Sequence, residues 1–215
     1  MEDFLSRERA RRDAYKLLSE CYYLPEEHMG DTLILLKGLM GDVCAAAVEH
    51  IPDLEEDIER LKIDYSKLFV GPFKLLAPPY GSVYLDGKRI LLGDSTMDAR
   101  NRYREAGLDI AAHFREAPDH IAVELEFMYY LVFKEVEAIE LSDFRSAMEY
   151  LARQRGFLED HLGVWVPEFA ANVERNATTD FYRNLVRATR AFVQEDLNSG
   201  VEASMAELSS LMPAE

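Results

Sequence analysis

The chain has 215 residues, a length that favours one domain over two and allows a sizeable buried core. Hydrophobic residues make up 48% of it, and Phe and Tyr number 11 each, which is too apolar and aromatic for a disordered chain. Lys and Arg total 24 against 40 Asp and Glu, so the formal net charge is −16. Such a surface repels phosphate backbones and anionic lipid headgroups and attracts basic ligands, which argues against nucleic acid and the membrane as partners.

Cysteine usage and the N-terminus favour a reducing compartment. Cys21 and Cys44 lie far apart on apolar helical stripes, and two cysteines form no disulfide framework, zinc knuckle or iron–sulfur run. Arg11 and Arg12 form a pair, but no apolar run or cleavage site follows it, so we expect no signal peptide. No stretch approaches the ~18 continuous apolar residues of a membrane-spanning helix. We therefore expect a soluble, cytoplasmic protein that is not exported and not inserted in a membrane.

Helical periodicity dominates the first third of the chain. Apolar residues recur at three- and four-residue intervals over residues 4–23, 29–48 and 54–69. Pro25 and Pro52 separate these runs. The pattern predicts three amphipathic helices.

The helical period disappears over residues 70–93, where Gly and Pro supply turn chemistry instead. Asp86-Gly87 stands between the short apolar runs 83–85 and 89–91 and favours a small hairpin with a type I′ turn. A connection of more than about 15 residues without a helix is more often functional, or a hinge, than idle. Such a hinge is also a route to a homodimer by domain swapping.

Helical patterns return after this segment. Ser95 or Thr96 is a candidate cap for a helix that ends at Ala106. Pro118 and Asp119 open a helix that is apolar nearly all round, as expected in the middle of a bundle. Further helices are expected from Ser142 to 161, over 165–173, from Thr178 or Thr179 to 197, and over 201–211. The sum is an all-α fold: a single-domain helical bundle of about eight to ten helices over residues 1–215, with one long irregular segment or hinge at about 70–93.

Catalytic motifs are missing from the sequence. It has no phosphate-binding loop, dinucleotide fingerprint, serine nucleophile elbow, HExxH zinc motif or ExxH di-iron pair. We therefore expect a protein that is not an enzyme, with no catalytic residue, no metal site and no cofactor of its own.

One polar cluster stands at the start of the central helix, made of Asp119, His120, Glu124 and Glu126. Asp119 is a candidate N-cap, because a carboxylate there accepts from free N–H groups and is favoured by the helix dipole. Ligand binding is the alternative interpretation, ahead of a metal or acid–base site. Both glutamates lie in so apolar a run that they need a groove, solvent or a partner such as arginine.

Five short strings follow one another between about residues 60 and 170. They are Leu68-Phe69-Val70-Gly71-Pro72; Ala77-Pro78-Pro79-Tyr80-Gly81-Ser82-Val83-Tyr84; Gly93-Asp94-Ser95-Thr96; Pro118-Asp119-His120 leading into Glu124-Leu125; and His161-Leu162 with Trp165-Val166-Pro167 and Phe169. In this order and spacing they resemble the TorD/DmsD/NarJ family of molybdoenzyme maturation chaperones. The residues in these strings are most similar to those of the DmsD and TorD branches.

The resemblance implies an all-helical cytoplasmic chaperone. Such a chaperone binds the twin-arginine leader peptide of a molybdopterin-containing anaerobic oxidoreductase and assists cofactor insertion and assembly before export. Its partners are the leader and the catalytic subunit that carries it. The leader-binding positions that the resemblance implies, with Tyr84 and Glu124 added as neighbours, are Leu68, Phe69, Pro79, Tyr80, Tyr84, Gly93, Asp119, His120 and Glu124.

The family mode of binding suggests a role for each part of this set. Leu68, Phe69 and the segment Pro78-Pro79-Tyr80 would take the apolar stretch of the leader. Asp119 with Glu124 or Glu126 would pair with its arginines. Tyr80 and Tyr84 stand where DmsD-like members often carry Trp, so an aromatic wall is kept with less area. His120 would make binding sensitive to pH near neutrality.

Two other classes of function stay open. One is an adaptor or chaperone that contacts the folded enzyme body, as in the nitrate reductase branch of the family. The other is a weak nucleotide-binding hydrolase, since some family members are linked to guanine nucleotides, although no phosphate loop supports it here.

Overall fold

The computed structural model describes residues 1–54, 57–71, 75–87, 92–108 and 116–212. These residues form helices and no strand, which confirms the expected all-α fold. Single-turn π-helical segments, η1 and η2, extend α4 and α10. The elements are α1 (Glu2–Glu20), α2 (Met29–Val43), α3 (Ala45–Val48), α4 (Ile58–Tyr65), η1 (Ser66–Val70), α5 (Ser82–Leu85), α6 (Asp94–Glu105), α7 (Ile121–Glu140), α8 (Phe144–Asp160), α9 (Leu162–Asn176), α10 (Asp180–Glu195), η2 (Asp196–Gly200) and α11 (Val201–Leu211).

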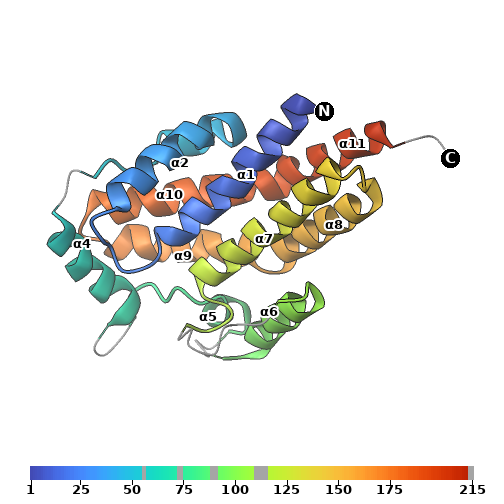
Figure 1. Cartoon of the computed structure of the whole chain (residues 1–215). Coiled ribbons are helices and arrows are strands. Elements are labelled where there is room, and N and C mark those ends of the chain that lie inside the picture. The colour runs from blue at the N-terminus through green and yellow to red at the C-terminus, as the bar shows by residue number, and fades with distance from the viewer. Residues whose placement is uncertain (55–56, 72–74, 88–91, 109–115, 213–215) are drawn as a thin grey trace.

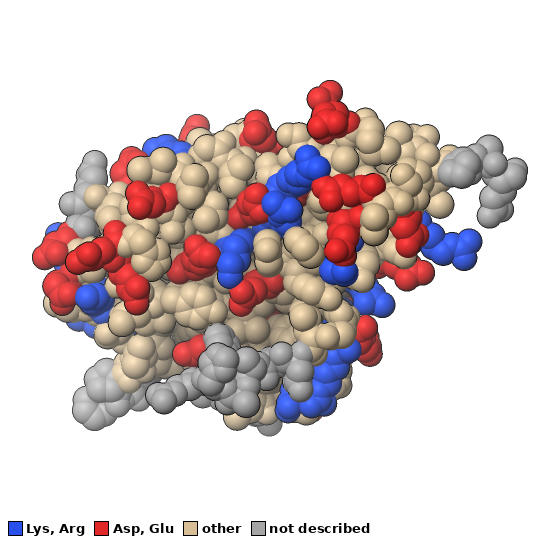
Figure 2. Space-filling model, in the orientation of Figure 1, with Lys and Arg blue, Asp and Glu red and all other residues tan. Residues whose placement is uncertain are grey.

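The long helices lie side by side as a bundle, and α4, α5 and α6 lie along its lower edge in Figure 1. α1 packs against both α2 and α7, α8 packs on the other side of α7, and α9 packs on α10. The apolar sequence of α7 fits this position, since a helix that is apolar nearly all round must be covered by neighbours. Figure 2 shows Asp and Glu spread over this face of the bundle, between patches of uncharged surface. None of the helices in the described ranges is long and apolar enough to cross a membrane.

The helical periods in the sequence locate most of these helices. The run 29–48 divides at Cys44, whose extended backbone (φ −157°, ψ 90°) separates α2 from α3. The run 54–69 becomes α4 followed by the π-helical turn η1. The run 165–173 is part of the longer helix α9.

The predicted hairpin is wrong in its first half, because residues 83–85 lie in the single helical turn α5. Its second half, residues 89–91, lies outside the described residues. A tertiary contact explains the difference: Asp119, which precedes α7, accepts hydrogen bonds from the backbone N–H groups of Gly81 and Ser82 and so fixes the start of this turn. The hinge and the swapped homodimer stay predictions.

The start of α8 differs from that expected, because Asp143, and not Ser142, caps this helix through its side chain. Thr179 is the N-cap residue of α10, as expected, but its side chain makes no capping hydrogen bond. Asp64 of α4 accepts hydrogen bonds from the backbone N–H groups of Thr178 and Thr179, which precede α10. This carboxylate therefore ties the segment before α10 to α4.

Candidate functional site

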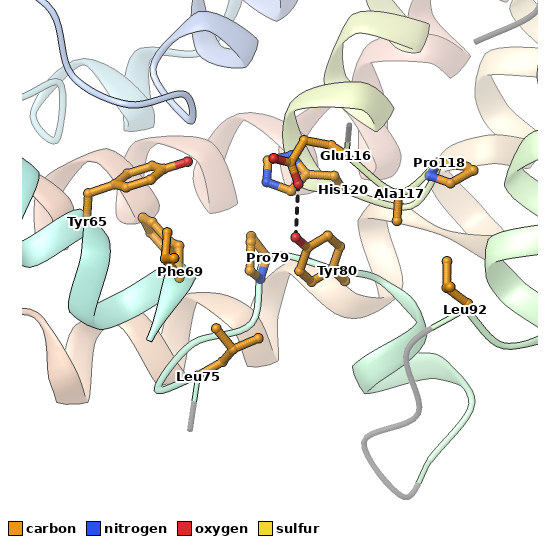
Figure 3. A pocket seen from close by; sticks show the side chains of 11 residues that line it. Tyr65, Phe69, Leu75, Pro79, Tyr80, Leu92, Glu116, Ala117, Pro118 and His120 are labelled. Carbon is orange, nitrogen blue, oxygen red and sulfur yellow. Dashed lines mark hydrogen bonds between the residues drawn. The ribbon is translucent and has the colours of Figure 1, made fainter. Parts of the chain in front are cut away.

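A groove of about 580 Å³ opens where η1, the segment before α5 and the segment before α7 meet. Figure 3 shows side chains from all of these segments converging on it. Its lining residues are Tyr65, Phe69, Val70, Leu75, Pro79, Tyr80, Leu92, Glu116, Ala117, Pro118 and His120. Most of these side chains are apolar or aromatic, but polar and apolar atoms share the lining surface about equally, and its one carboxylate among the described residues is that of Glu116. We call it the Tyr80 groove below.

The π-helical turn η1 supplies the floor of the Tyr80 groove. Phe69 is only 5% exposed, and its ring packs edge-on against Tyr65 at 5.2 Å and Tyr182 at 5.5 Å between centroids. Leu68, next to it, is fully buried and does not line the groove. Gly71 ends the turn with a φ of 49°, a conformation that glycine adopts without strain. π-helical turns of this kind are frequent at functional sites.

The wall of the groove is a pair of extended segments joined by backbone hydrogen bonds. Ile121 N donates to Pro79 O at 2.9 Å, and Tyr80 and His120 form an isolated antiparallel bridge. The Tyr80 hydroxyl donates to Glu116 Oε2 at 2.9 Å, the dashed line in Figure 3. Burial and the neighbouring Glu116 carboxylate raise the pKa of Tyr80, so the phenol stays protonated and keeps donating.

His120 is the N-cap of α7, the role that the sequence assigned to Asp119. Its Nδ1 accepts from Ala122 N at 3.2 Å, so the ring proton of the neutral imidazole belongs on Nε2. Burial lowers the pKa of His120 to about 4. This lowered pKa argues against the expected pH sensitivity of His120 near neutrality, because burial favours the neutral imidazole there.

Asp119 is fully buried and does not line the groove. Its Oδ2 accepts from Ser82 N at 2.8 Å and its backbone oxygen accepts from Gly81 N at 2.8 Å. Its Oδ1 has no hydrogen-bond partner in the described part of the chain. Asp119 therefore ties α5 to the start of α7.

Glu124 is also fully buried, in a polar network that joins α7 to α6 and α9. Its Oε2 accepts from Trp165 Nε1 at 2.8 Å, and its Oε1 lies 3.5 Å from His161 Nδ1. His161 Nε2 lies 2.7 Å from Asp98 Oδ2. Burial raises the pKa of Glu124. Burial acts against the charged form of His161, but the carboxylates of Glu124 and Asp98 outweigh it and raise the pKa of this imidazole.

Tyr84 and Gly93 lie outside the groove lining as well. Tyr84 stacks on Trp165 with 5.6 Å between ring centroids. A Cβ at Gly93 would collide with the carboxylate of Asp86, which accepts from the backbone N–H of Ser95 at 3.2 Å. Asp86 therefore caps α6, and Ser95, one of the two residues that the sequence offered as the cap, donates its backbone N–H to Asp86.

The structure brings together four of the residues that the sequence singled out, and places the others around them. Phe69, Pro79, Tyr80 and His120 line the groove. The residues that pack outside the lining are Leu68, Tyr84, Gly93, Asp119 and Glu124. Sequence reasoning missed Glu116, Tyr65, Leu75 and Leu92. The available signal for Glu116 was its place beside the Pro118-Asp119-His120 string.

A helical bundle with an aromatic groove and one accessible carboxylate is the arrangement of a binding protein. Within the described ranges, no group of His, Cys, Asp and Glu side chains could hold a metal ion.

Comparison with known proteins identifies the family. The family model described as nitrate reductase delta subunit matches residues 36–171. The chaperone protein TorD of Aliivibrio salmonicida (strain LFI1238) is 28% identical over 161 residues, 74% of each chain. The Tat proofreading chaperone DmsD of Salmonella typhi is 29% identical over 199 residues, 88% of this chain and 90% of DmsD. A crystal structure of a redox enzyme maturation protein from Archaeoglobus fulgidus matches with a TM-score of 0.54 and 28% identity, covering 85% of this chain and 93% of that one.

The chain belongs to the nitrate reductase delta subunit family, the group in which the TorD and DmsD chaperones also fall. The resemblance carried by the five strings is thereby confirmed. The chaperone names of these relatives also support the prediction that the protein is not an enzyme.

Proposed function

We propose that this chain is a cytoplasmic chaperone for a molybdoenzyme and that it binds the twin-arginine leader peptide of that enzyme in the Tyr80 groove. The relatives named TorD and DmsD support the chaperone role, and one relative carries Tat proofreading in its name. The observation that supports peptide binding most strongly is the groove itself, which combines apolar and aromatic side chains with the Glu116 carboxylate in its wall.

The apolar stretch of the leader packs on Phe69, Leu75 and Pro79. The volume of about 580 Å³ falls within the range of ligand sites, and removal of apolar surface from water drives such binding at roughly 25 cal/mol per Å². Pro79 offers a rigid contact, because its backbone oxygen is already tied to Ile121 N. The groove is therefore shaped before the peptide arrives.

An arginine of the leader pairs with Glu116. This side chain is partly exposed, and the Tyr80 hydroxyl occupies only one of its oxygen atoms. A guanidinium binds a carboxylate through charge-assisted hydrogen bonds, and the net charge of −16 adds a long-range attraction for a basic peptide. Asp119 and Glu124 are fully buried and accept hydrogen bonds from the chain itself, so we assign them the task of positioning the wall.

Titration calorimetry tests this function with a synthetic twin-arginine leader from a molybdopterin oxidoreductase of the same genome, and with the same peptide carrying alanine for both arginines. We expect the alanine peptide to bind at least about tenfold more weakly. Tyr80→Ala should weaken leader binding by about tenfold, while Tyr150→Ala on α8, away from the groove, should leave it unchanged. Binding of the folded enzyme body without binding of the leader would favour the adaptor alternative and overturn the proposal.

A further inference from the structure

Helix α2 is apolar on two faces, and the chain covers only one of them. Leu33 and Leu36 are buried against the bundle. Ile34 and Leu35 point outward and are 72% and 59% exposed. A helix that is apolar all round is normally covered on every side, and an exposed apolar patch commonly marks an interaction surface.

These exposed side chains border a second groove of about 580 Å³ between α2, α1 and α7. α2 contributes Ile34, Leu35, Gly38 and Leu39, and Leu17 of α1 and Tyr129 of α7 close its sides. We call it the α2 groove. It shares no described lining residue with the Tyr80 groove.

Gly38 keeps the α2 groove open. A Cβ at this position would meet no atom within 4 Å, and the residue has an ordinary helical backbone, so the packing of the chain does not require glycine here. Glycine inside a helix destabilises it relative to alanine. The hollow at Gly38 is therefore space for a side chain that the chain itself does not provide.

Carboxylates stand at both ends of this apolar face. Asp31 and Asp42 lie on the same face of α2 as Leu35 and Gly38, and their separation along the helix is about 16 Å at 1.5 Å per residue. Both are exposed. The cation at the rim, Lys16, is already paired with Glu126 at 2.7 Å. Figure 2 shows uncharged surface over part of α2 with acidic side chains near it, and basic as well as acidic side chains over α1.

We propose that the α2 groove binds a basic amphipathic helix of a partner protein. The apolar face of that helix covers Ile34 and Leu35, one of its side chains enters the hollow at Gly38, and its Lys or Arg residues reach Asp31 and Asp42. A second copy of this chain fits poorly, because two-fold pairing of α2 with itself places Asp31 and Asp42 against carboxylates of the other copy. The same carboxylates repel anionic lipid headgroups.

A model peptide tests the charge and shape of this surface. The probe is a fluorescein-labelled helical peptide of about 18 residues, with Leu at helical spacing on one face and Lys on the other, and the control peptide has Glu for Lys. Fluorescence anisotropy with the full chain should show binding of the Lys peptide only. Gly38→Gln fills the hollow and should weaken binding by about tenfold or more. Ala152→Gln, at an exposed helical position on α8 outside the lining, should change binding less than twofold, within the scatter expected for a surface substitution.

Two further measurements separate this proposal from its competitors. The double substitution Asp31→Asn with Asp42→Asn should weaken binding of the Lys peptide several-fold and reduce the salt dependence of that binding. Leader binding should be the same in Gly38→Gln and in the unsubstituted chain, so the two grooves fail or succeed independently. Equal binding of the Glu peptide, undiminished binding in Gly38→Gln, or a dimer in sedimentation that Gly38→Gln dissociates would each overturn the proposal.

Discussion

The polar residues around the Tyr80 groove are of two kinds: those that face the groove, and those that are buried behind it and position its wall. Glu116 faces the groove and keeps one oxygen atom free of the Tyr80 hydroxyl. Asp119 and Glu124 are buried and accept from Ser82 N and from the Trp165 indole. Substitution of Asp119 or Glu124 therefore changes the shape of the wall, whereas substitution of Glu116 removes a contact for the ligand.

The low pKa of His120 predicts a specific pH dependence of stability. Burial moves this pKa from its ordinary 6.5 to about 4, so the unfolded chain binds more protons than the folded chain between these values. The free energy of unfolding should therefore fall as the pH falls from 6.5 towards 4. His120→Asn keeps an N-cap acceptor without a titrating group, and should reduce this fall by up to about 1.4 kcal/mol per pH unit.

Urea denaturation at a series of pH values measures this difference. Leu141→Asn is the control, because Leu141 is 75% exposed and carries no titrating group, so this substitution should leave the pH dependence unchanged. Equal pH dependence in His120→Asn and the unsubstituted chain would contradict the assignment of a neutral, buried His120.

At the scale of elements, helical periodicity in the sequence located the bundle helices but not the contacts that begin them. α5 and α6 each start at a carboxylate from outside the helix: Asp119 and Asp86. A local pattern shows that a helix starts near a Thr or Ser, but it does not show which distant side chain accepts the free N–H groups. The hairpin prediction failed for this reason, because the bond from Ser82 N to Asp119 favours a helical turn.

The groove was predictable in part for a related reason. Phe69, Pro79, Tyr80 and His120 belong to strings that the family resemblance singles out. Choosing between the acidic residues Glu116 and Asp119 requires the backbone pairing of Tyr80 with His120, which sets the side that each carboxylate faces. Sequence alone contains no such pairing.

Gly81 allows α5 to approach α9 closely. A Cβ there would come within 3.1 Å of Trp165 Nε1 and 3.3 Å of Glu124 Oε1. Gly81→Ala should therefore lower the free energy of unfolding by about 1–3 kcal/mol and shift the fluorescence of Trp165, the sole tryptophan. Gly41→Ala, where a Cβ meets nothing, should raise the stability by about 0.5–1 kcal/mol. Equal stability of the two variants in urea melts would refute the close approach.

At the scale of the whole molecule, a buried charge cluster joins helices from both ends of the chain. Arg11 of α1 donates to Glu8 at 2.8 Å, to Glu135 of α7 at 2.9 Å and to Asp196 of η2 at 3.1 Å. Gln154 of α8 donates to the same Glu135 oxygen at 2.8 Å. The first arginine of the N-terminal pair is thus an internal structural residue.

Removal of the guanidinium leaves the buried acidic side chains of Glu8, Glu135 and Asp196 without their cation. Arg11→Met should lower the free energy of unfolding by about 3–5 kcal/mol. Arg12→Met is the matched control, because the Arg12 side chain is 23% exposed and, among the described residues, forms its ion pair with the adjacent Asp13, so its loss should be about 0–1 kcal/mol. Similar losses for the two variants in chemical denaturation would contradict the central role of Arg11.

The cluster also predicts a loss of stability as the pH rises from 4.5 towards 8. Burial and the nearby carboxylates of Glu8 and Asp196 outweigh the charge of Arg11 and raise the pKa of Glu135 to about 8. The folded chain therefore binds more protons than the unfolded chain above the ordinary value of 4.5, and stability falls as the pH rises towards 8. Glu135→Gln should remove most of this fall in thermal or urea melts between pH 5 and 9. A fall of unchanged size would show that Glu135 is already ionised when the chain is folded.

The most direct test of leader binding in the groove is a double-mutant cycle between Glu116 and an arginine of the leader. Calorimetry would compare the chain and Glu116→Gln, each with the native leader and with a leader carrying Gln for one arginine. We predict a coupling of about 1 kcal/mol for one of the two arginines, and none when Glu126→Gln, a carboxylate outside the groove, replaces Glu116→Gln. Additive effects at Glu116 with both arginines would contradict the account.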